Sequence, residues 1–187
     1  NNNLAQTAQF DSAGNENSNT NLKELVGQTK SKGVELDITV RPVSNLSIIA
    51  GYSYNDMRYS KTPDTKGSYI EGERLVNTPQ HTANGSVFYT FNSFAIKGLK
   101  IGASVFYTGN RYGGWNNTID QAQQYSRLIP VDGFTTIDIS AGYTIKNISL
   151  LAKLSNITNE FNYIVHENYS VNPIATRQLV ATVSYKF

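Results

Sequence analysis

The sequence predicts an all-β protein, specifically a transmembrane antiparallel β-barrel, and three observations support this. Apolar and polar residues alternate through seven segments of the chain. No apolar run approaches the roughly 20 residues that a membrane helix needs. Short and long connections also alternate between the segments. Because successive side chains of a strand point to opposite faces, each segment presents an uncharged stripe on one face and mostly polar groups on the other.

The first four segments carry their stripes on every second residue. The first stripe consists of Val34, Leu36, Ile38 and Val40, which alternate with Glu35, Asp37 and Thr39. The second consists of Leu46, Ile48, Ala50, Tyr52 and Tyr54, which alternate mainly with small polar residues. The third stripe, at positions 83–91, is weaker because Phe88 falls on its polar side. The fourth, at positions 99–107, is uninterrupted. All four segments are therefore predicted as strands.

The last three segments repeat the pattern and the chain stops on an aromatic residue. Their stripes occupy alternate positions of 137–145, 148–154 and 179–187. The final stripe ends with Tyr185 and Phe187, an aromatic ending that resembles the C-terminal signal by which bacterial outer-membrane barrels are recognised for assembly. These segments complete a set of seven predicted strands.

The charges in these segments fall on one parity. The apolar stripes have no Lys, Arg, Asp or Glu at their central positions, whereas the other parity holds Glu35, Asp37, Asp138 and Lys153. A charge at the lipid-facing midplane of a barrel costs about 2 to 4 kcal/mol, while lumen positions are tolerant. These four residues are therefore predicted to face the lumen. Aromatic residues near the stripe ends suit two interfacial girdles.

The connections between the segments differ in length in a regular order. Three are short, at positions 42–45, 92–98 and 146–147, and three are long, at positions 60–73, 111–132 and 159–175. Barrels of this kind have short periplasmic turns and longer extracellular loops. The order therefore places Phe187 at the periplasmic end.

Seven strands are too few for a closed barrel, because bacterial barrels normally have an even number from eight upward. Leu4, Gln6, Ala8 and Phe10 could end an eighth strand. Two interpretations follow: a complete eight-stranded barrel, or the last part of a larger one. Since unpaired strand edges are not tolerated in lipid, the second requires further strands upstream.

Composition limits the other classes of function. Hydrophobic residues make up 39% of the 187 residues, which include 12 Tyr, 14 Gly and no Cys. The lack of cysteine excludes disulfides, thiol catalysis and cysteine metal sites. A net charge of +2 with 16% charged residues leaves no basic face large enough for nucleic acid. With two histidines, His81 and His166, and no spacing typical of a triad or a metal site, neither an enzyme nor a protein metal site is predicted. His81 is expected to have a packing or hydrogen-bonding role.

The long loops carry the predicted binding residues. Cations and rigid aromatic side chains suit an anionic, partly aromatic ligand such as an iron chelate, through charge-assisted hydrogen bonds and stacking. The candidates are Arg111, Tyr112, Trp115, Tyr125, Arg127 and, in the last long loop, His166. Loop packing for the aromatic residues and solvation for the arginines and His166 are the alternatives.

The order of local motifs resembles the C-terminal barrel region of TonB-dependent outer-membrane receptors, particularly the siderophore-receptor branch. The resemblance covers residues 22–187 and rests on the segments GQTKSKGVEL (27–36), GERLVNTPQHT (72–82), GNRYGG (109–114), DGFTTIDISAGY (132–143), LSNITN (154–159) and the terminal RQLVATVSYKF. The NITN segment at 156–159 departs from the family's Asn-Leu-Phe-Asp turn.

The resemblance implies a barrel of about 22 strands whose lumen is filled by a plug. Residues 1–21 would then be the end of an upstream strand and an extracellular loop, and residues 22–187 the C-terminal strands, with no plug in this chain. It also implies that the protein lies in the bacterial outer membrane, in contact with its lipid, and that it imports a ferric siderophore or another metal chelate. The TonB complex would supply the energy through the plug. The barrel-assembly machinery would assemble the barrel by recognising Tyr185 and Phe187. A self-standing eight-stranded barrel with a structural or adhesive role is the alternative.

Overall fold

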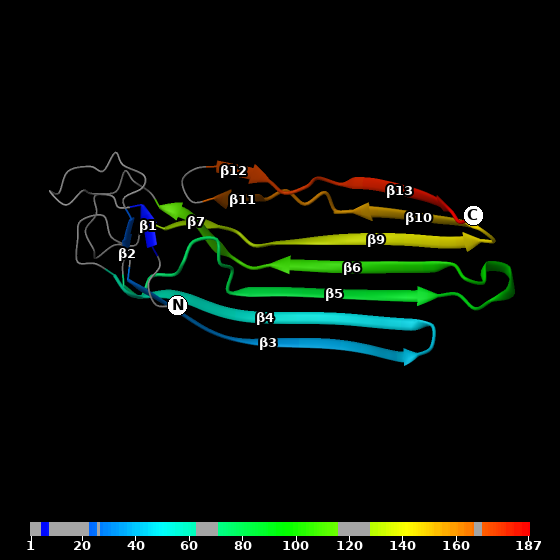
Figure 1. Ribbon diagram of the computed structural model, residues 1–187, viewed down its shortest axis with the longest axis horizontal. Coiled ribbons are helices and arrows are strands. Elements are labelled where there is room, and N and C mark those ends of the chain that lie inside the picture. The colour runs from blue at the N-terminus through cyan, green and yellow to red at the C-terminus, as the bar shows by residue number, and fades with distance from the viewer. Residues whose placement is uncertain (1–4, 8–22, 26, 63–70, 116–127, 167–169) are drawn as a thin grey trace.

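One antiparallel sheet of seven strands dominates the computed structural model, which describes residues 5–7, 23–25, 27–62, 71–115, 128–166 and 170–187 (Figure 1). The strand order is β13-β10-β9-β6-β5-β4-β3. The strands are β3 (Gln28–Val43), β4 (Leu46–Lys61), β5 (His81–Thr90), β6 (Lys100–Thr108), β9 (Phe134–Ile145), β10 (Ile148–Ser155) and β13 (Gln178–Tyr185). These strands confirm the seven segments predicted from the alternation.

The strand register brings all seven apolar stripes onto one face. Ile38 lies opposite Ala50, Ala50 opposite Gly85, and Gly85 opposite Val105. The same correspondence continues across β6, β9, β10 and β13. Because directly opposed residues of antiparallel strands share a face, the predicted stripes form one continuous apolar surface, called the outward face below, and the polar parity forms the opposite, inward face.

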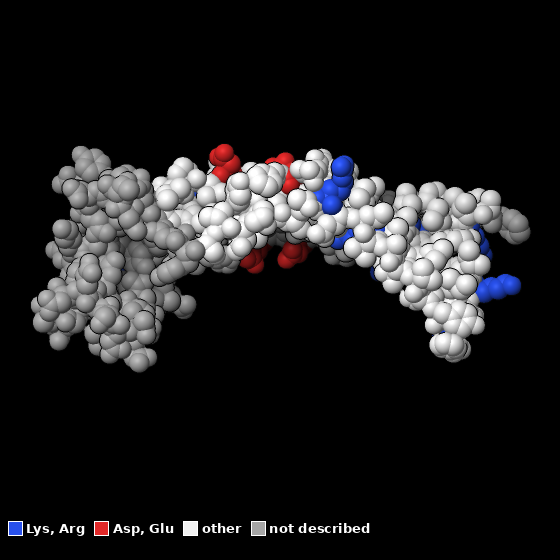
Figure 2. Space-filling model, turned by 90° about the horizontal axis from the view of Figure 1, so that it is seen from above, with Lys and Arg blue, Asp and Glu red and all other residues white. Residues whose placement is uncertain are grey.

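The outward face has no second layer over it among the described residues. Leu36 is 55% exposed and Val183 is 71% exposed. Figure 2 shows the described strands edge-on as a thin, curved layer. Uncovered aliphatic surface on this scale is unfavourable in water, and hydrocarbon supplies the missing cover. No helix in the described part of the chain is long and apolar enough to cross a membrane.

Aromatic side chains bracket the apolar band on the outward face. Toward the loops, the Tyr52 hydroxyl lies 2.8 Å from Nδ1 of His81, and the Tyr54 ring centroid lies 5.1 Å from that of His81. The predicted packing and hydrogen-bonding role of His81 is thereby confirmed. Toward the turns, Tyr185 packs edge-on against Phe187 with centroids 5.0 Å apart. Such bands are typical of the two interfaces of a membrane barrel.

Phe88 is an apolar residue on the otherwise polar inward face, and the adjacent strand β6 has a glycine at the position that faces it. It lies opposite Gly102, where a Cβ would come within 2.6 Å of Cδ1 of Phe88. The ring therefore packs over the bare backbone of Gly102, as aromatic residues do beside strand glycines. The deviation in the sequence pattern is a local packing device on the inward face.

The connections follow the predicted order, with more structure in the long ones than predicted. The short turn between β9 and β10 contains Lys146 at φ 52°, and that between β5 and β6 contains η1 (Phe94–Ile96). No strand was predicted within the long loops, but two of them contain a hairpin. One forms a hairpin of β7 (Arg111–Trp115) and β8 (Leu128–Val131), and another a hairpin of β11 (Tyr163–His166) and β12 (Ser170–Pro173).

The N-terminal residues do not extend the large sheet in the described structure. Within the segment considered as the end of an eighth strand, β1 (Ala5–Thr7) pairs with β2 (Lys23–Leu25) in a separate two-stranded sheet. Leu4, Ala8 and Phe10 lie outside the described residues. The sheet therefore has two open edges, β3 and β13.

Candidate functional site

The loop end of the sheet gathers the polar side chains that are most enclosed. Arg111, Asn156 and Asn162 are 6%, 3% and 9% exposed, and they are the buried polar residues of the described chain. The hairpins β7–β8 and β11–β12 both extend from this end (Figure 1). They approach closely, since a Cβ on Gly113 would lie 3.0 Å from Cβ of Val165.

Arg111 occupies the centre of this loop cluster. Its Nη1 donates to the carbonyl oxygen of Asp132 at 3.1 Å, and its Nη2 donates to Oδ1 of Asn162 at 3.1 Å and to the carbonyl oxygen of Tyr163. The guanidinium carbon lies 5.4 Å from the Phe134 ring centroid. Burial lowers the pKa of Arg111, which stays charged because an arginine titrates far above neutral pH. The guanidinium, proposed from sequence to meet a ligand, is thus committed to contacts within the protein.

Tyr112 points to a different set of partners. It is half-buried, its ring centroid lies 5.7 Å from the guanidinium carbon of Arg74, and its carbonyl oxygen accepts a hydrogen bond from Asn77 N at 2.7 Å. Arg74 was not among the residues selected from sequence. Its position in the GERLVNTPQHT segment offered only the family resemblance as a signal.

The remaining predicted ligand contacts are Trp115, Tyr125, Arg127 and His166, and the structure describes none of their side chains. Trp115 ends β7 opposite Leu128, and His166 ends β11 opposite Ser170, but their side chains lie outside what the structure describes. Tyr125 and Arg127 lie outside the described residues. The described backbone brings the hairpins bearing Trp115 and His166 to the same end of the sheet.

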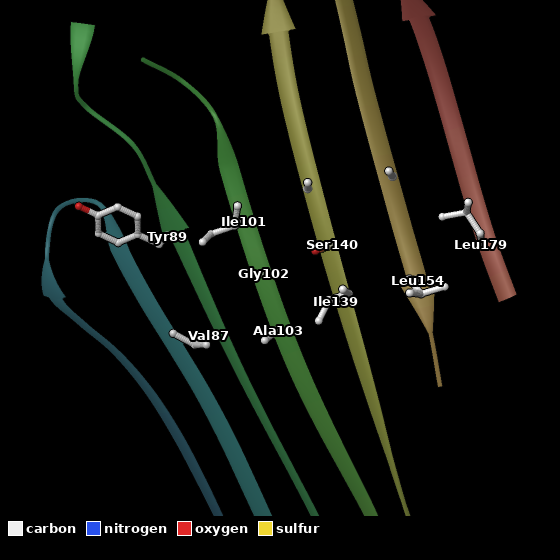
Figure 3. Close-up of a pocket in the computed structure, with 11 residues that line it drawn as sticks. Val87, Tyr89, Ile101, Gly102, Ala103, Ile139, Ser140, Leu154 and Leu179 are labelled. Atoms are coloured by element: carbon white, nitrogen blue, oxygen red, sulfur yellow. The ribbon is translucent and has the colours of Figure 1, made fainter. Parts of the chain in front are cut away.

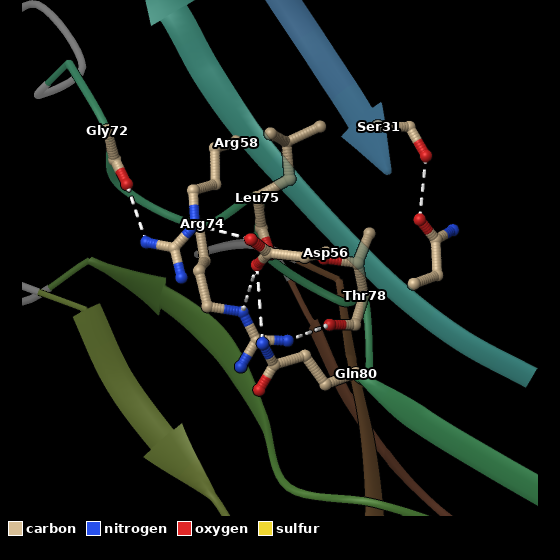
Figure 4. A network of polar contacts seen from close by, with 9 residues as sticks. Ser31, Asp56, Arg58, Gly72, Arg74, Leu75, Thr78 and Gln80 are labelled. Atoms are coloured by element: carbon tan, nitrogen blue, oxygen red, sulfur yellow. Dashed lines mark hydrogen bonds and ion pairs between the residues drawn. The ribbon is translucent and has the colours of Figure 1, made fainter. Parts of the chain in front are cut away.

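A second polar network joins β4 to the segment before β5 (Figure 4). Nε of Arg58 donates to Oδ2 of Asp56 at 2.8 Å, and Nη1 of Arg58 donates to the carbonyl oxygen of Gly72 at 2.8 Å. Arg74 lies on the other side, with Nε 4.0 Å from Oδ1 of Asp56 and Nη2 donating to the carbonyl oxygen of Thr78 at 3.0 Å. Asp56 thus lies between two guanidinium groups.

The four charges predicted to face a lumen share the inward face. Glu35 lies opposite Ser53, Asp37 opposite Gly51, and Lys153 opposite Ser140. Nζ of Lys153 forms an ion pair with Oδ2 of Asp138 at 2.8 Å. All four are therefore on the polar side of the sheet, and none interrupts the apolar surface.

Asn156 organises the turn that leads from β10 to the last hairpin. It adopts φ 50°, and its Nδ2 donates to the carbonyl oxygens of Glu160 and Ala175, each at 2.9 Å. Its backbone N–H donates to Oδ1 of Asp138 at 2.9 Å. Asparagine tolerates this left-handed conformation better than most residues, which explains the residue type at this position of the LSNITN segment.

An apolar depression lies on the outward face, away from the loop cluster. It encloses about 680 Å³ and is lined by side chains of β5, β6, β9, β10 and β13, including Tyr89, Ala103 and Leu179 (Figure 3). Small residues, Ala141 and Ala152, lie opposite each other there and leave room between the larger side chains around them. Such a lining suits hydrocarbon rather than a charged chelate. Among the described residues, no group of three or more His, Cys, Asp or Glu could hold a metal ion.

Comparison with known proteins gives a consistent result. Residues 2–157 match the family described as TonB dependent receptor-like, beta-barrel. An uncharacterised TonB-dependent receptor of Haemophilus influenzae is 28% identical over 75% of this chain and 39% of its own length. The ferrichrome outer membrane transporter and phage receptor of Escherichia coli is 25% identical over 86% of this chain and 20% of its own length.

A solved structure supports the same fold. The siderophore receptor PiuA from Acinetobacter baumannii superposes with a TM-score of 0.73 at 21% identity, over 99% of this chain and 24% of the other. The chain therefore spans between about a fifth and two fifths of the proteins it matches.

Proposed function

The chain belongs to the TonB-dependent receptor-like β-barrel family of the bacterial outer membrane, and we propose that the whole protein imports a metal chelate, a ferric siderophore above all. Members of this family are receptors and transporters that work with TonB, rather than enzymes. The observation that carries the proposal is the family match together with a sheet whose seven apolar stripes share one face. The self-standing eight-stranded barrel is not favoured.

Under this proposal, the chain has two parts, and the charged residues of its inward face contact the plug. Residues 1–21 would be the end of an upstream strand and its extracellular loop, and residues 22–187 the last strands of the barrel, whose open edges β3 and β13 need partner strands in lipid. Glu35, Asp37 and the Asp138–Lys153 pair would contact the plug, which is energised by the TonB complex. Tyr185 and Phe187 would be read by the barrel-assembly machinery.

The loop cluster supplies the proposed cargo contacts. Tyr112, Trp115, Tyr125, Arg127 and His166 would meet the chelate by stacking and charge-assisted hydrogen bonds. Since the guanidinium of Arg111 already holds Asp132, Asn162 and Tyr163, we assign it to positioning the two hairpins. This proposal separates residues that touch the cargo from one that shapes the site.

Uptake of radioactive iron as defined siderophores tests the proposal in cells that carry the full-length protein as their only receptor. We expect at least one ferric siderophore to enter in a TonB-dependent manner. Trp115→Ala with Arg127→Ala should weaken binding while leaving the amount of assembled barrel unchanged, whereas Lys146→Gln, in a turn at the opposite end, should change neither. Absence of TonB-dependent uptake across hydroxamate, catecholate and carboxylate siderophores would contradict the proposed cargo.

A further inference from the structure

A row of cations crosses the outward face just beyond the aromatic girdle of the loop end. Lys30 on β3 lies directly opposite Arg58 on β4, and Arg58 lies directly opposite Arg74. In the neighbouring row toward the membrane, Lys32 lies opposite Asp56. Lys30, Arg58 and Arg74 thus form a cationic row.

The register places this row on the lipid-facing side. β4 continues without a register shift from Ile48 through Tyr52 and Tyr54 to Arg58, and all of these positions share one parity. The same parity on β3 runs from Leu36 to Lys30. The cations are therefore on the same face as the apolar stripes and not on the face assigned to the lumen.

The row also lies at the height of lipid headgroups. Arg58 is four residues beyond Tyr54, which corresponds to about 14 Å along a strand and about 10 Å along the normal for a strand tilted by about 45°. The headgroup region extends about 5 to 8 Å beyond the hydrocarbon on each side. Lys32 falls within that region, and the flexible Lys30 and Arg58 side chains can reach back into it.

The cationic row and the neighbouring Lys32 carry more positive charge than the nearby carboxylates neutralise. Like charges directly opposite each other destabilise a sheet, and here three cations are aligned. Asp56 supplies one carboxylate between Arg58 and Arg74, and Glu71 lines the same depression of about 410 Å³. The side chains of Lys30 and Lys32 are exposed and form no hydrogen bond or ion pair with another described residue. Nε of the mostly buried Arg74 has no hydrogen-bond partner among the described residues.

We propose that Lys30, Lys32, Arg58 and Arg74 form a binding site for the phosphate groups of glycolipid in the outer leaflet of the membrane. Phosphate oxygens would accept hydrogen bonds from the two lysines and the free edge of the guanidinium groups, and would relieve the repulsion along the row. The depression between β3, β4 and Gly72 gives such a headgroup a place to sit. This inference uses the membrane placement of the sheet and is independent of the cargo.

Retention of lipid by the detergent-purified full-length receptor, measured by native mass spectrometry, tests the proposal. The receptor is incubated with lipid A that carries two phosphates, with dephosphorylated lipid A, or with inorganic phosphate. We expect the phosphorylated lipid to be retained in preference, and Lys30→Gln with Lys32→Gln to lower that retention about tenfold. Lys30→Arg with Lys32→Arg should preserve it.

Arg41→Gln with Lys100→Gln provides the matched control, because these residues line an inward-facing depression and the pair removes the same charge. This control should retain lipid like the wild type. Heat-modifiable gel mobility should show that all variants are folded. Equal retention of the two lipids, equal loss in the control, or occupancy by inorganic phosphate without preference for the lipid would overturn the glycolipid assignment.

Discussion

Arg111 and Asn162 are joined by a hydrogen bond of 3.1 Å between Nη2 and Oδ1, although 51 residues separate them in the chain. Both side chains also contact the carbonyl oxygen of Asp132, each at 3.1 Å. One buried guanidinium therefore holds β7, the connection before β9 and the start of β11 together. The hairpins that carry the proposed cargo contacts depend on this link for their relative position.

Arg111→Ala should loosen both hairpins while leaving the membrane-spanning strands intact. The change removes the three hydrogen bonds that the buried guanidinium makes to Asp132, Asn162 and Tyr163, so we expect local opening to become easier by about 3 kcal/mol. Hydrogen exchange of β7 and β11 amides measures this. Arg177→Ala is the control, because that residue is exposed and its Nη1 contact to the Ile157 carbonyl is 3.5 Å long. Similar exchange in the two variants would contradict the role of Arg111.

The sequence predicted the sheet well because the membrane imposes a rule on every strand. An apolar residue at every second position is required where one face touches lipid, so Val34, Ile48 and Val183 could be assigned to one face before the structure was known. The loop cluster follows no such rule. The partners of Arg111 come from three separate segments, and no periodicity encodes their meeting. The sequence therefore indicated a charged, aromatic loop region but not which of its arginines is buried.

The ion pair of Asp56 with Arg58 gives the loop end of β4 a pH dependence. Asp56 lies beyond Tyr54 and outside the membrane-spanning part of the strand. The hydrogen bond from Arg58, followed by smaller contributions from Gln80 and Arg74, lowers the pKa of Asp56 below its ordinary 3.8, against the opposing effect of burial. Since the folded-state pKa is the lower one, the pair stabilises fully above about pH 4 and loses this contribution as the pH falls through the folded value.

Asp56→Asn should therefore open the contact between β4 and the 71–75 segment at neutral pH, and the difference from the wild type should shrink as the pH falls below about 4. Exchange of the Tyr59 and Leu75 amides, which donate to the carbonyls of Glu73 and Met57, measures the opening. Asp132→Asn is a control, since the structure assigns Asp132 hydrogen bonds through its backbone carbonyl. A pH-independent difference would show that Asp56 acts by its shape and not by its charge.

The two faces of β13 should respond differently to a charge. Val183 lies opposite Leu150 on the outward face, and Ser184 lies opposite Ser149 on the inward face. Val183→Arg should destabilise the barrel by about 2 to 4 kcal/mol if it is near the midplane, and Ser184→Arg by far less. Denaturant unfolding of the full-length receptor from lipid vesicles provides both values. Equal effects would be incompatible with lipid on the apolar face.

Gly33 is required where β3 passes β4. A Cβ at this position would lie 2.2 Å from the carbonyl oxygen of Tyr54, a backbone atom that cannot move without disturbing the pairing. Gly33→Ala should cost about 2 kcal/mol of unfolding free energy. Gly85→Ala is the matched strand control, since its nearest contact would be an ordinary 3.4 Å to Cγ1 of Val105. A stability loss no larger than that of Gly85→Ala would show that β3 accommodates the methyl group by shifting.

Asn156 serves its turn in two ways that substitutions can separate. Its left-handed backbone disfavours alanine by about 1 kcal/mol, and its side chain fills hydrogen bonds to Glu160 and Ala175 that no short apolar residue can replace. Asn156→Ala should lose both contributions, about 3 kcal/mol in total, whereas Asn156→Gly should lose the hydrogen bonds alone.

Asn159→Gly provides the reference for these two substitutions. Asn159 shares the left-handed conformation at φ 54°, but its side chain accepts one hydrogen bond, from Arg177 N at 3.0 Å. The expected order of destabilisation, measured by denaturant unfolding and by exchange of the β11–β12 amides, is Asn156→Ala, then Asn156→Gly, then Asn159→Gly. Wild-type stability in Asn156→Gly would mean that the turn needs only the backbone conformation, and that the buried amide contributes nothing to holding the last hairpin.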